Sequence, residues 1–347
     1  MSVFTHAEFD DHEQVLFCRD RSVGLTGIIA IHSMSLGPAA GGCRMHAYEN
    51  EDAALADVLR LSKGMSYKNA MANLPLGGGK CVIIADPSTP GKADLLRAFS
   101  KHVQSLSGRY WTAIDVGVGP ADADLLAENC DYVFARASEY PEGFNPSLFT
   151  ALGGFMGVRA AASHVWGRDD LTGLTVAVQG CGATGRDLCR QLHEAGAKLI
   201  VTDVNEAATA FVANAYGAAI VAPDAIYAAN ADIFAPCALG AILNDQTIPQ
   251  LKAKAISGLA NNQLAEPRHG QALLDCGITY VPDYVVNGGD VMGAAALIYS
   301  EPSIEESQAK IRGLYETILN ILDHAKAAGA PPSEVADQMA REKLAAA

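Results

Sequence analysis

The chain lacks a long hydrophobic run, an excess of basic residues and any regular spacing of cysteines. Its most apolar stretch, Ala151 to Trp166, carries Arg159 and His164, so it is too short and too polar to span a bilayer. The N-terminus, MSVFTHAEFDDHE, is acidic and has no apolar core, unlike a signal peptide. A formal net charge of −14 argues against nucleic acid or an anionic membrane as a partner, because either would favour a basic face.

Metal-binding and disulfide patterns are also missing. Eight cysteines are scattered without a CxxC pair, and nine histidines form neither an HExxH motif nor a Cys/His cluster at ligand spacing. We therefore expect no metal site, and reduced thiols in a cytoplasmic protein. With 347 residues, half of them hydrophobic, the chain is long enough for two domains with sizeable cores.

The stretch from Leu174 to Asp203 has the pattern of a β-α-β unit. A β-branched run leads into a glycine-rich turn, a helix pattern and a second apolar run. The glycines permit a tight turn and let main-chain N–H groups approach a pyrophosphate at the helix N-terminus. The final acidic residue accepts hydrogen bonds from a ribose and repels a 2′-phosphate, so the expected ligand is NAD rather than NADP. The cofactor-binding residues predicted here are Gly180, Cys181, Gly182, Ala183, Thr184, Gly185, Asp203 and Val204.

Strand and helix patterns continue on both sides of this unit. Further strands at Asp232 to Phe234, Ala255 to Ser257 and Ile278 to Val281 would complete a doubly wound sheet. The loops that follow the first two should face the cofactor, and they carry Cys237, Ala238 and Asn261. We expect an α/β fold of two domains. Residues 1–145 with 328–347 would form an N-terminal α/β substrate and oligomerisation domain, and 146–327 a Rossmann NAD-binding domain.

The first 145 residues mix strands with helices. Asn50 is placed to cap a helix with an apolar side, which indicates an α/β domain. The expected strands are Gln14 to Cys18, Gly27 to His32 and Cys81 to Ala85, and the later helices are Lys92 to Leu106 and Pro120 to Asn129.

Two glycine-rich patches, residues 36–44 and 63–80, contain the unusual lysines of this domain. A phosphate-binding P-loop at Lys80 is rejected, because Leu74 stands where the pattern needs glycine and Cys81 where it needs Ser or Thr. Most lysines are solvated surface amines. Lys80, however, lies between three glycines and an apolar run, where a long charged side chain is unexpected unless it has a function. Asp115, which ends an extended run, is equally a turn residue or a functional carboxylate.

Together these residues resemble the Glu/Leu/Phe/Val amino acid dehydrogenases, nearest the NAD-dependent leucine and phenylalanine branch. The similarity covers nearly the whole chain. Its most specific parts are Gly-Met-Ser-Tyr-Lys-Asn from Gly64, Pro75-Leu76-Gly77-Gly78-Gly79-Lys80, Asp115-Val116, Asn145-Pro146-Ser147, VAVQG from Val176 and ANNQL from Ala260.

The resemblance implies a role for each matching residue. Lys68 would bind the substrate carboxylate, together with Met65 and the main chain around Gly41 and Gly42. Lys80 would activate the water that is added to, or lost from, the imine. Asp115 would exchange a proton with the substrate amino group. Thr150 and Asn261 fall where the family holds nicotinamide and substrate, and the substrate side-chain pocket is expected from Ala40, Ala113, Val291 and Ala294.

The chemistry of oxidative deamination agrees with these roles. Hydride transfer from the α-carbon to nicotinamide leaves an iminium that water must attack, which requires a base. A charged lysine cannot serve, so Lys80 must be kept uncharged by desolvation or by another cation, for which Lys68 is a candidate. A carboxylate then carries the amine proton.

One departure from the family bears on the substrate. The family often has Asn-Ala-Gly-Gly where this chain has Asn287-Gly288-Gly289-Asp290, and Asp290 either binds a polar substrate group or, as we favour, caps the following helix. Small side chains at Ala40 and Ala294 predict a roomy pocket. We therefore expect phenylalanine or another large apolar L-amino acid as substrate, with leucine or another branched-chain amino acid as the alternative.

Two other functions are weighed against this one. A hydroxy-acid dehydrogenase usually employs a histidine paired with a carboxylate and an arginine, whereas the lysine-rich glycine patches fit amine chemistry better. A non-catalytic NAD-binding sensor is disfavoured by the intact set of Lys68, Lys80 and Asp115. The resemblance further implies a homo-oligomer built from dimers through the first domain, acting on an amino acid, its 2-oxo acid and ammonia.

Overall fold

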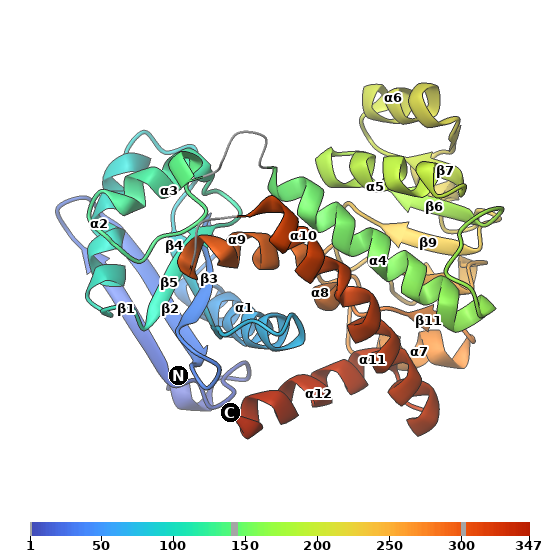
Figure 1. Cartoon of the computed structure of the whole chain (residues 1–347). Helices are drawn as coiled ribbons and strands as arrows, with labels where there is room; N and C mark the ends of the chain where they lie inside the picture. The colour runs from blue at the N-terminus through green and yellow to red at the C-terminus, as the bar shows by residue number, and fades with distance from the viewer. Residues whose placement is uncertain (1, 140–144, 300–302) are drawn as a thin grey trace. The chain divides into compact units, whose positions relative to one another are not determined.

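The computed structural model describes residues 2–139, 145–299 and 303–347, and the chain divides into two compact units (Figure 1). Unit 1 comprises Met1–Phe144, Ala294–Pro302 and Ala340–Ala347, and unit 2 comprises Asn145–Gly293 and Ser303–Met339. Each unit contains one β-sheet, so the expected two-domain α/β architecture is confirmed. The division of tasks between substrate and cofactor domains stays a prediction at this point.

The sheet of unit 1 has the strand order β1-β2-β4-β3-β5. Its strands are β1 (Gln14–Asp20), β2 (Leu25–Ser33), β3 (Ala39–His46), β4 (Gly77–Ile84) and β5 (Tyr110–Ile114). β1, β2 and β4 are antiparallel neighbours, whereas β3 runs parallel to both β4 and β5. The carboxyl ends of β3, β4 and β5 therefore lie at the same edge of the sheet.

Helices cover both faces of this sheet, which explains why β2 and β4 read as almost continuous apolar runs. Ile28, Ala30 and Val82 pack with α1 (Glu51–Met71) on one face. On the other face their sequence neighbours pack with α2 (Lys92–Gln104) and α3 (Pro120–Ala127). Because side chains alternate along a strand, Lys80 shares the α1 face with Val82. The predicted cap of α1 is confirmed, since the Asn50 side chain accepts a hydrogen bond from the Ala53 N–H (2.8 Å).

The six-stranded sheet of unit 2 is entirely parallel and has the order β11-β10-β9-β6-β7-β8. Its strands are β6 (Thr175–Gln179), β7 (Lys198–Thr202), β8 (Ala219–Ile220), β9 (Ile233–Pro236), β10 (Ala255–Ile256) and β11 (Thr279–Tyr280). The order reverses direction between β6 and β9, which is the doubly wound Rossmann arrangement. Ligands of such sheets bind beyond the strand ends at that reversal.

The helices after residue 145 belong to unit 2, except that parts of two of them lie in unit 1, from Ala294 and from Ala340 onward. They are α4 (Pro146–Trp166), α5 (Ala183–Glu194), α6 (Glu206–Tyr216), α7 (Arg268–Asp275), α8 (Asp283–Val286), α9 (Gly289–Tyr299), α10 (Ile304–Arg312), α11 (Leu314–Ala328) and α12 (Pro332–Ala346). Within unit 1, the end of α12 is tied to α1. Arg341 Nε donates to the Tyr67 hydroxyl (2.8 Å), and Lys343 Nζ donates to the Ala70 carbonyl (3.1 Å).

Several predicted boundaries differ from the structure, and strand β3 was not expected. The glycine-rich patch at residues 36–44 is largely strand β3, and the segment after Gly288 is helix α9. Among the described residues, no helix is both long and apolar enough to cross a membrane. The same residues contain no group of His, Cys, Asp and Glu side chains arranged to hold a metal ion. All eight cysteines are free thiols.

Candidate active site

The glycine run before Lys80 is required by close packing inside unit 1. A Cβ at Gly78 would lie 2.1 Å from the Ser66 Oγ of α1, and a Cβ at Gly79 would lie 2.6 Å from the Tyr110 ring of β5. Glycine therefore lets α1 pack against one face of β4 and the Tyr110 ring against the other. This packing holds Lys80 on the strand with 7 % of its surface exposed.

Asp115 follows β5 in a tight turn and is the ion-pair partner of Lys80. Lys80 Nζ lies 2.6 Å from Asp115 Oδ2. Asp115 and Val118 exchange backbone hydrogen bonds, and Gly117 between them has a φ of +78°, so the carboxylate stands on a fixed turn. Asp115 is therefore a turn residue, which was one of the two roles considered for it. Its carboxylate also contacts Lys80.

A second cation contacts the same carboxylate oxygen. Arg44 on β3 places its Nε 3.2 Å from Asp115 Oδ2. Burial alone would raise the pKa of the Asp115 carboxyl, but the charges of Lys80 and Arg44, with the hydrogen bond from Lys80, lower it by more. The pKa of Asp115 is therefore below its usual value, and the group is a carboxylate at neutral pH.

Arg44 was missed as a site residue by sequence reasoning. It lies in the first glycine patch, but its contact with Asp115 spans 71 residues of sequence. The available signal was its place: a charged residue directly after Ala39-Ala40-Gly41-Gly42-Cys43, in a patch that was not recognised as a strand. A charge inside a largely buried strand requires a partner, although the sequence does not say which.

The predicted substrate residues of unit 1 surround this pair. A Cβ at Gly42 would lie 2.9 Å from the Asp115 Cβ, and a Cβ at Gly41 would lie 3.1 Å from Met65 Cγ, so both glycines are close-approach positions. Lys68 lies on α1 about one helical turn after Met65. Two predicted pocket residues, Ala40 on β3 and Ala113 on β5, are buried on these neighbouring strands.

The nucleotide turn of unit 2 follows β6, at the reversal of strand order, and its shape fits a dinucleotide. Gly180 has a φ of +103°, and a Cβ at Gly185 would lie 2.0 Å from the Gly180 carbonyl oxygen, so α5 can begin directly against the turn. At Gly182, the N-cap of α5, a Cβ would meet nothing within 4 Å. The N-terminus of α5, formed by Ala183 and Thr184, is therefore open to an approaching pyrophosphate.

Asp203 ends β7 beside this turn. Its Oδ2 accepts a hydrogen bond from the Cys181 N–H (2.6 Å), and its Oδ1 accepts one from the Asn205 N–H (2.8 Å). The carboxylate is thus held at the strand end, where the fingerprint expects a ribose to bind. Val204, the next residue, is an apolar side chain with 92 % of its surface exposed.

The loops after β9 and β10 are joined to each other, and they carry the other predicted cofactor residues. The Ala241 N–H donates to the Asn262 carbonyl (2.7 Å), and the Leu243 N–H donates to the Gln263 carbonyl (2.9 Å). Cys237 and Ala238 lie next to Gly180, since a Cβ at that glycine would be 2.9 Å from Ala238 Cβ and from the Cys237 carbonyl carbon.

Asn261 has a buried partner that sequence reasoning did not name. Asn287 Nδ2 donates to Asn261 Oδ1 (2.7 Å), which fixes the orientation of that amide. Thr150 lies on α4, whose backbone passes within 3.3 Å of the position of a Cβ at Gly289, the first residue of α9.

Helix α9 carries the last predicted residues, Val291 and Ala294. Asp290 also lies on it. The helix already begins at Gly289, so Asp290 is inside the first turn rather than at the expected cap position before it. There its Oδ1 accepts a hydrogen bond from the Val291 N–H (2.6 Å).

Comparison with known proteins identifies the family. A family model described as Glu/Leu/Phe/Val dehydrogenase, dimerisation domain, matches residues 12–132. A leucine dehydrogenase from Geobacillus stearothermophilus is 50 % identical over 344 residues, which is 99 % of this chain and 94 % of that protein. A valine dehydrogenase from Streptomyces albus is 44 % identical over 345 residues, with 99 % and 94 % covered. The chain belongs to the Glu/Leu/Phe/Val dehydrogenase family.

A solved structure agrees with this assignment. The L-tryptophan dehydrogenase from Nostoc punctiforme superposes with a TM-score of 0.86 at 43 % sequence identity, and 96 % of each chain is covered. As a member of the family the chain is an amino acid dehydrogenase, and NAD is its cofactor. The hydroxy-acid dehydrogenase and the non-catalytic sensor considered above are therefore set aside.

Proposed function

We propose that this enzyme catalyses the reversible NAD-dependent oxidative deamination of a branched-chain L-amino acid, leucine first, to the 2-oxo acid and ammonia. The observation that carries the chemistry is the buried contact of 2.6 Å between Lys80 Nζ and Asp115 Oδ2. The leucine and valine dehydrogenases that resemble this chain along its whole length support the substrate class. The preference for phenylalanine or another large side chain, expected from the small pocket residues, is the second candidate, and the 43 % identical tryptophan dehydrogenase supports it.

In this proposal each residue of the pair has one task. NAD held by the nucleotide turn of unit 2 would supply the hydride acceptor, and the substrate would then be an iminium at its α-carbon. Uncharged Lys80 takes a proton from the attacking water, so the water oxygen adds to that carbon. Asp115 passes this proton on to the nitrogen, so ammonia leaves as the C–N bond breaks, and the hydroxyl group gives its own proton to Lys80 as it becomes the 2-oxo group. Lys68, with the main chain of Gly41 and Gly42, would hold the substrate carboxylate, which gives the lysine-rich glycine patches their function.

Assembly and location belong to the same proposal. The match of residues 12–132 to a dimerisation domain supports a homo-oligomer that pairs through unit 1. A cytoplasmic location is supported by the eight unpaired cysteines.

The test is a panel of kcat/KM values for leucine, valine, phenylalanine, tryptophan and glutamate, each with NAD and with NADP. We expect leucine or valine with NAD to exceed phenylalanine and tryptophan by more than about tenfold, since one or two methylene groups are worth about that much discrimination. Higher values for phenylalanine or tryptophan would replace leucine with the large-side-chain candidate. A preference for glutamate would overturn the apolar pocket, and the absence of ammonia-dependent NADH oxidation with every 2-oxo acid would overturn the reaction itself.

A further inference from the structure

Five charged groups of unit 1 form a chain of alternating sign that ends at the proposed base. Arg44 lies in the middle, because its Nη1 is 2.9 Å from Asp57 Oδ2 while its Nε is 3.2 Å from Asp115 Oδ2. Beyond Asp57, Arg60 Nη2 contacts the other carboxylate oxygen at 3.0 Å. Beyond Asp115 stands Lys80. The arginine in the middle is partly buried, with 22 % of its side chain exposed.

From this arrangement we infer that Arg44 is a positioning residue for the deamination reaction: it holds the Asp115 carboxylate in place and keeps it charged while Lys80 gains and loses its proton. The inference rests on the proposed roles of Lys80 and Asp115. It adds a residue that touches neither the substrate nor the cofactor in that proposal and acts through Asp115.

The physical reason is that Lys80 and Arg44 share one oxygen. During turnover the proposed base must alternate between its charged and uncharged forms, and an Asp115 paired with Lys80 alone would lose its only counter-ion in one of them. A guanidinium stays protonated at every pH at which the enzyme works. With Arg44 beside it, Asp115 therefore keeps one fixed positive neighbour in both states of the lysine, and Lys80 can release a proton without leaving a bare carboxylate.

Arg44 is itself fixed from its far side by Asp57. The Tyr48 hydroxyl donates to Asp57 Oδ2 (2.7 Å), the same oxygen that Arg44 contacts. Burial would raise the pKa of the Asp57 carboxyl, but Tyr48, Arg44 and Arg60 together lower it, so Asp57 is also anionic. The arginine thus bridges two carboxylates in a set orientation.

The charged and titratable groups around Asp115 come from β3, β4 and α1 and from the segments beside them. β4 contributes Lys80 and the buried thiol of Cys81, and β3 contributes Arg44 and the buried thiol of Cys43. The remaining groups belong to α1 and to the adjoining cavity of about 600 Å³ beside Arg44, which is lined by Glu8, His46, Tyr48, Asp57 and Arg60. Among these groups, Lys80 and Arg44 are the two cations whose contacts reach Asp115 Oδ2.

The experiment compares pH profiles of kcat/KM for the oxidation of the preferred amino acid by the wild-type enzyme and Arg44→Gln. Without Arg44, Asp115 takes up a proton at higher pH, because one of the two cations that contact its Oδ2 is gone. This change moves the rising limb of the profile to higher pH. We expect a shift of about 1 to 2 pH units, as for the loss of one cation near a carboxylate, with activity below the limb falling about tenfold per unit.

A series of further variants distinguishes a positioning role of Arg44 from a role in folding alone. Tyr48→Phe should move the limb in the same direction by a smaller amount, because it loosens the hold of Asp57 on Arg44 without removing a charge. Arg44→Lys keeps a charge but not the two-sided contact, so it should fall between the wild type and Arg44→Gln. Arg97→Gln is the matched control, since Arg97 forms a comparable ion pair with Glu128 elsewhere in unit 1 (2.6 Å). It should leave the profile unchanged.

Chemical rescue gives an independent readout. In Arg44→Ala the cavity beside Arg44 should admit free guanidinium at millimolar concentration, and activity should rise with guanidinium but not with urea. A profile of Arg44→Gln that keeps its limb and falls equally at all pH values, with no rescue of Arg44→Ala, would overturn the inference and leave a purely structural arginine. If instead the wild type fails to oxidise any amino acid, the proposed function has failed, and the two failures are thus distinguishable.

Discussion

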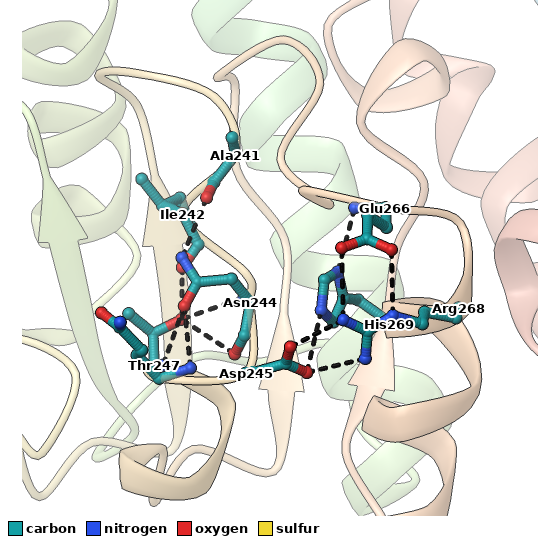
Figure 2. Close-up of polar contacts among 9 residues, drawn as sticks. Ala241, Ile242, Asn244, Asp245, Thr247, Glu266, Arg268 and His269 are labelled. Atoms are coloured by element: carbon teal, nitrogen blue, oxygen red, sulfur yellow. Dashed lines mark hydrogen bonds and ion pairs between the residues drawn. The ribbon is translucent and has the colours of Figure 1, made fainter.

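Two clusters of charged residues, one in each unit, differ strongly in how far their side chains are exposed to solvent. In unit 1, Lys80, Asp115 and Arg44 expose 9, 18 and 22 % of their side chains. In unit 2, Asp245, Arg268 and Glu266 expose 68, 55 and 58 % (Figure 2). The second cluster has the more regular geometry, because Arg268 contacts both oxygens of Asp245, at 2.6 and 2.7 Å.

The exposed cluster has the larger pKa shift, but its exposure makes a functional role less well supported. Its hydrogen bonds from Arg268 lower the pKa of Asp245 to about 2. Pairs of this kind face water, are screened by salt and contribute little net stability. Burying the charges of the unit 1 cluster, in contrast, costs desolvation free energy that apolar residues in the same place would avoid. A charge that is costly to bury is therefore better evidence of function than a charge whose pKa is strongly shifted.

The exposed cluster has a structural explanation. His269 is buried and lies between the two chain segments, with Nδ1 2.9 Å from the Glu266 nitrogen and Nε2 3.3 Å from Asp245 Oδ1. In the same loop, Asn244 Oδ1 accepts a hydrogen bond from the Thr247 N–H (3.1 Å) (Figure 2). These contacts fasten the loop that follows β9 to the start of α7. They position the backbone near the nucleotide turn without supplying a reactive group.

The largest expected difference between the clusters comes from Lys80→Gln. The amide can still donate to Asp115 but cannot accept a proton from water, so kcat should fall by about 10² to 10⁴, the usual contribution of a general base. Binding of NADH, measured by its fluorescence, should be retained, since the nucleotide turn lies in unit 2.

Lys92→Gln is the matched control for this variant. Lys92 forms an ion pair of nearly the same length with Asp122, 2.7 Å, but at the contact of α2 with α3. Its kcat should stay near the wild-type value. If Lys80→Gln also kept near-normal turnover, Lys80 would lose its proposed role, and the buried cluster would be no more functional than the exposed one.

A smaller effect is expected at the nucleotide turn, which is built from backbone rather than charge. Gly182→Ala adds a methyl group where the protein leaves space, so the free energy of unfolding should change by no more than about 1 kcal/mol. The same methyl group would stand where a pyrophosphate approaches the N-terminus of α5, so KM for NAD should rise about tenfold or more while kcat changes little.

Gly91→Ala provides the comparison, because Gly91 is the N-cap of α2 and a Cβ there also meets nothing within 4 Å. It should alter neither the stability nor the KM for NAD. Equal KM values in both variants would mean that no pyrophosphate binds at Gly182, and the predicted cofactor residues would have to be reassigned.

How far the sequence predicts these sites depends on how local each signal is. The nucleotide unit was predictable because strand, turn, helix and Asp203 follow one another within 30 residues. Lys80 was recognisable because a charge followed three glycines. Strand β3 was not recognised, since glycine disfavours strands. Its glycines are explained only by the neighbouring strands: a Cβ at Gly41 would lie 1.9 Å from the Gly79 carbonyl oxygen of β4, and a Cβ at Gly42 would lie 2.3 Å from the Ile114 carbonyl oxygen of β5.

The residues that contact the predicted site residues were harder to predict from the sequence. Arg44 meets Asp57 and Asp115 only after β3 takes its place between β4 and β5, and no local pattern encodes that order. The start of helix α9 was misplaced for a related reason. The helix begins at Gly289, after another glycine, where sequence favours a turn and where packing against the Phe149 backbone decides otherwise.

The smallest effect is expected from Asp245→Asn, which removes the charge of the exposed cluster. The folded pKa of Asp245, about 2, lies below its ordinary value of 3.8, so the ion pair stabilises the fold above about pH 4 and loses this contribution as pH falls toward 2. Melting temperatures of variant and wild type should therefore differ slightly at neutral pH, converge in acid, and differ less in high salt. Because the cluster fastens a loop rather than reacting, kcat/KM should stay within about twofold of the wild type. A large loss of turnover with an unchanged melting temperature would give the exposed cluster a catalytic part, and burial would then no longer separate the functional charges of this enzyme from the structural ones.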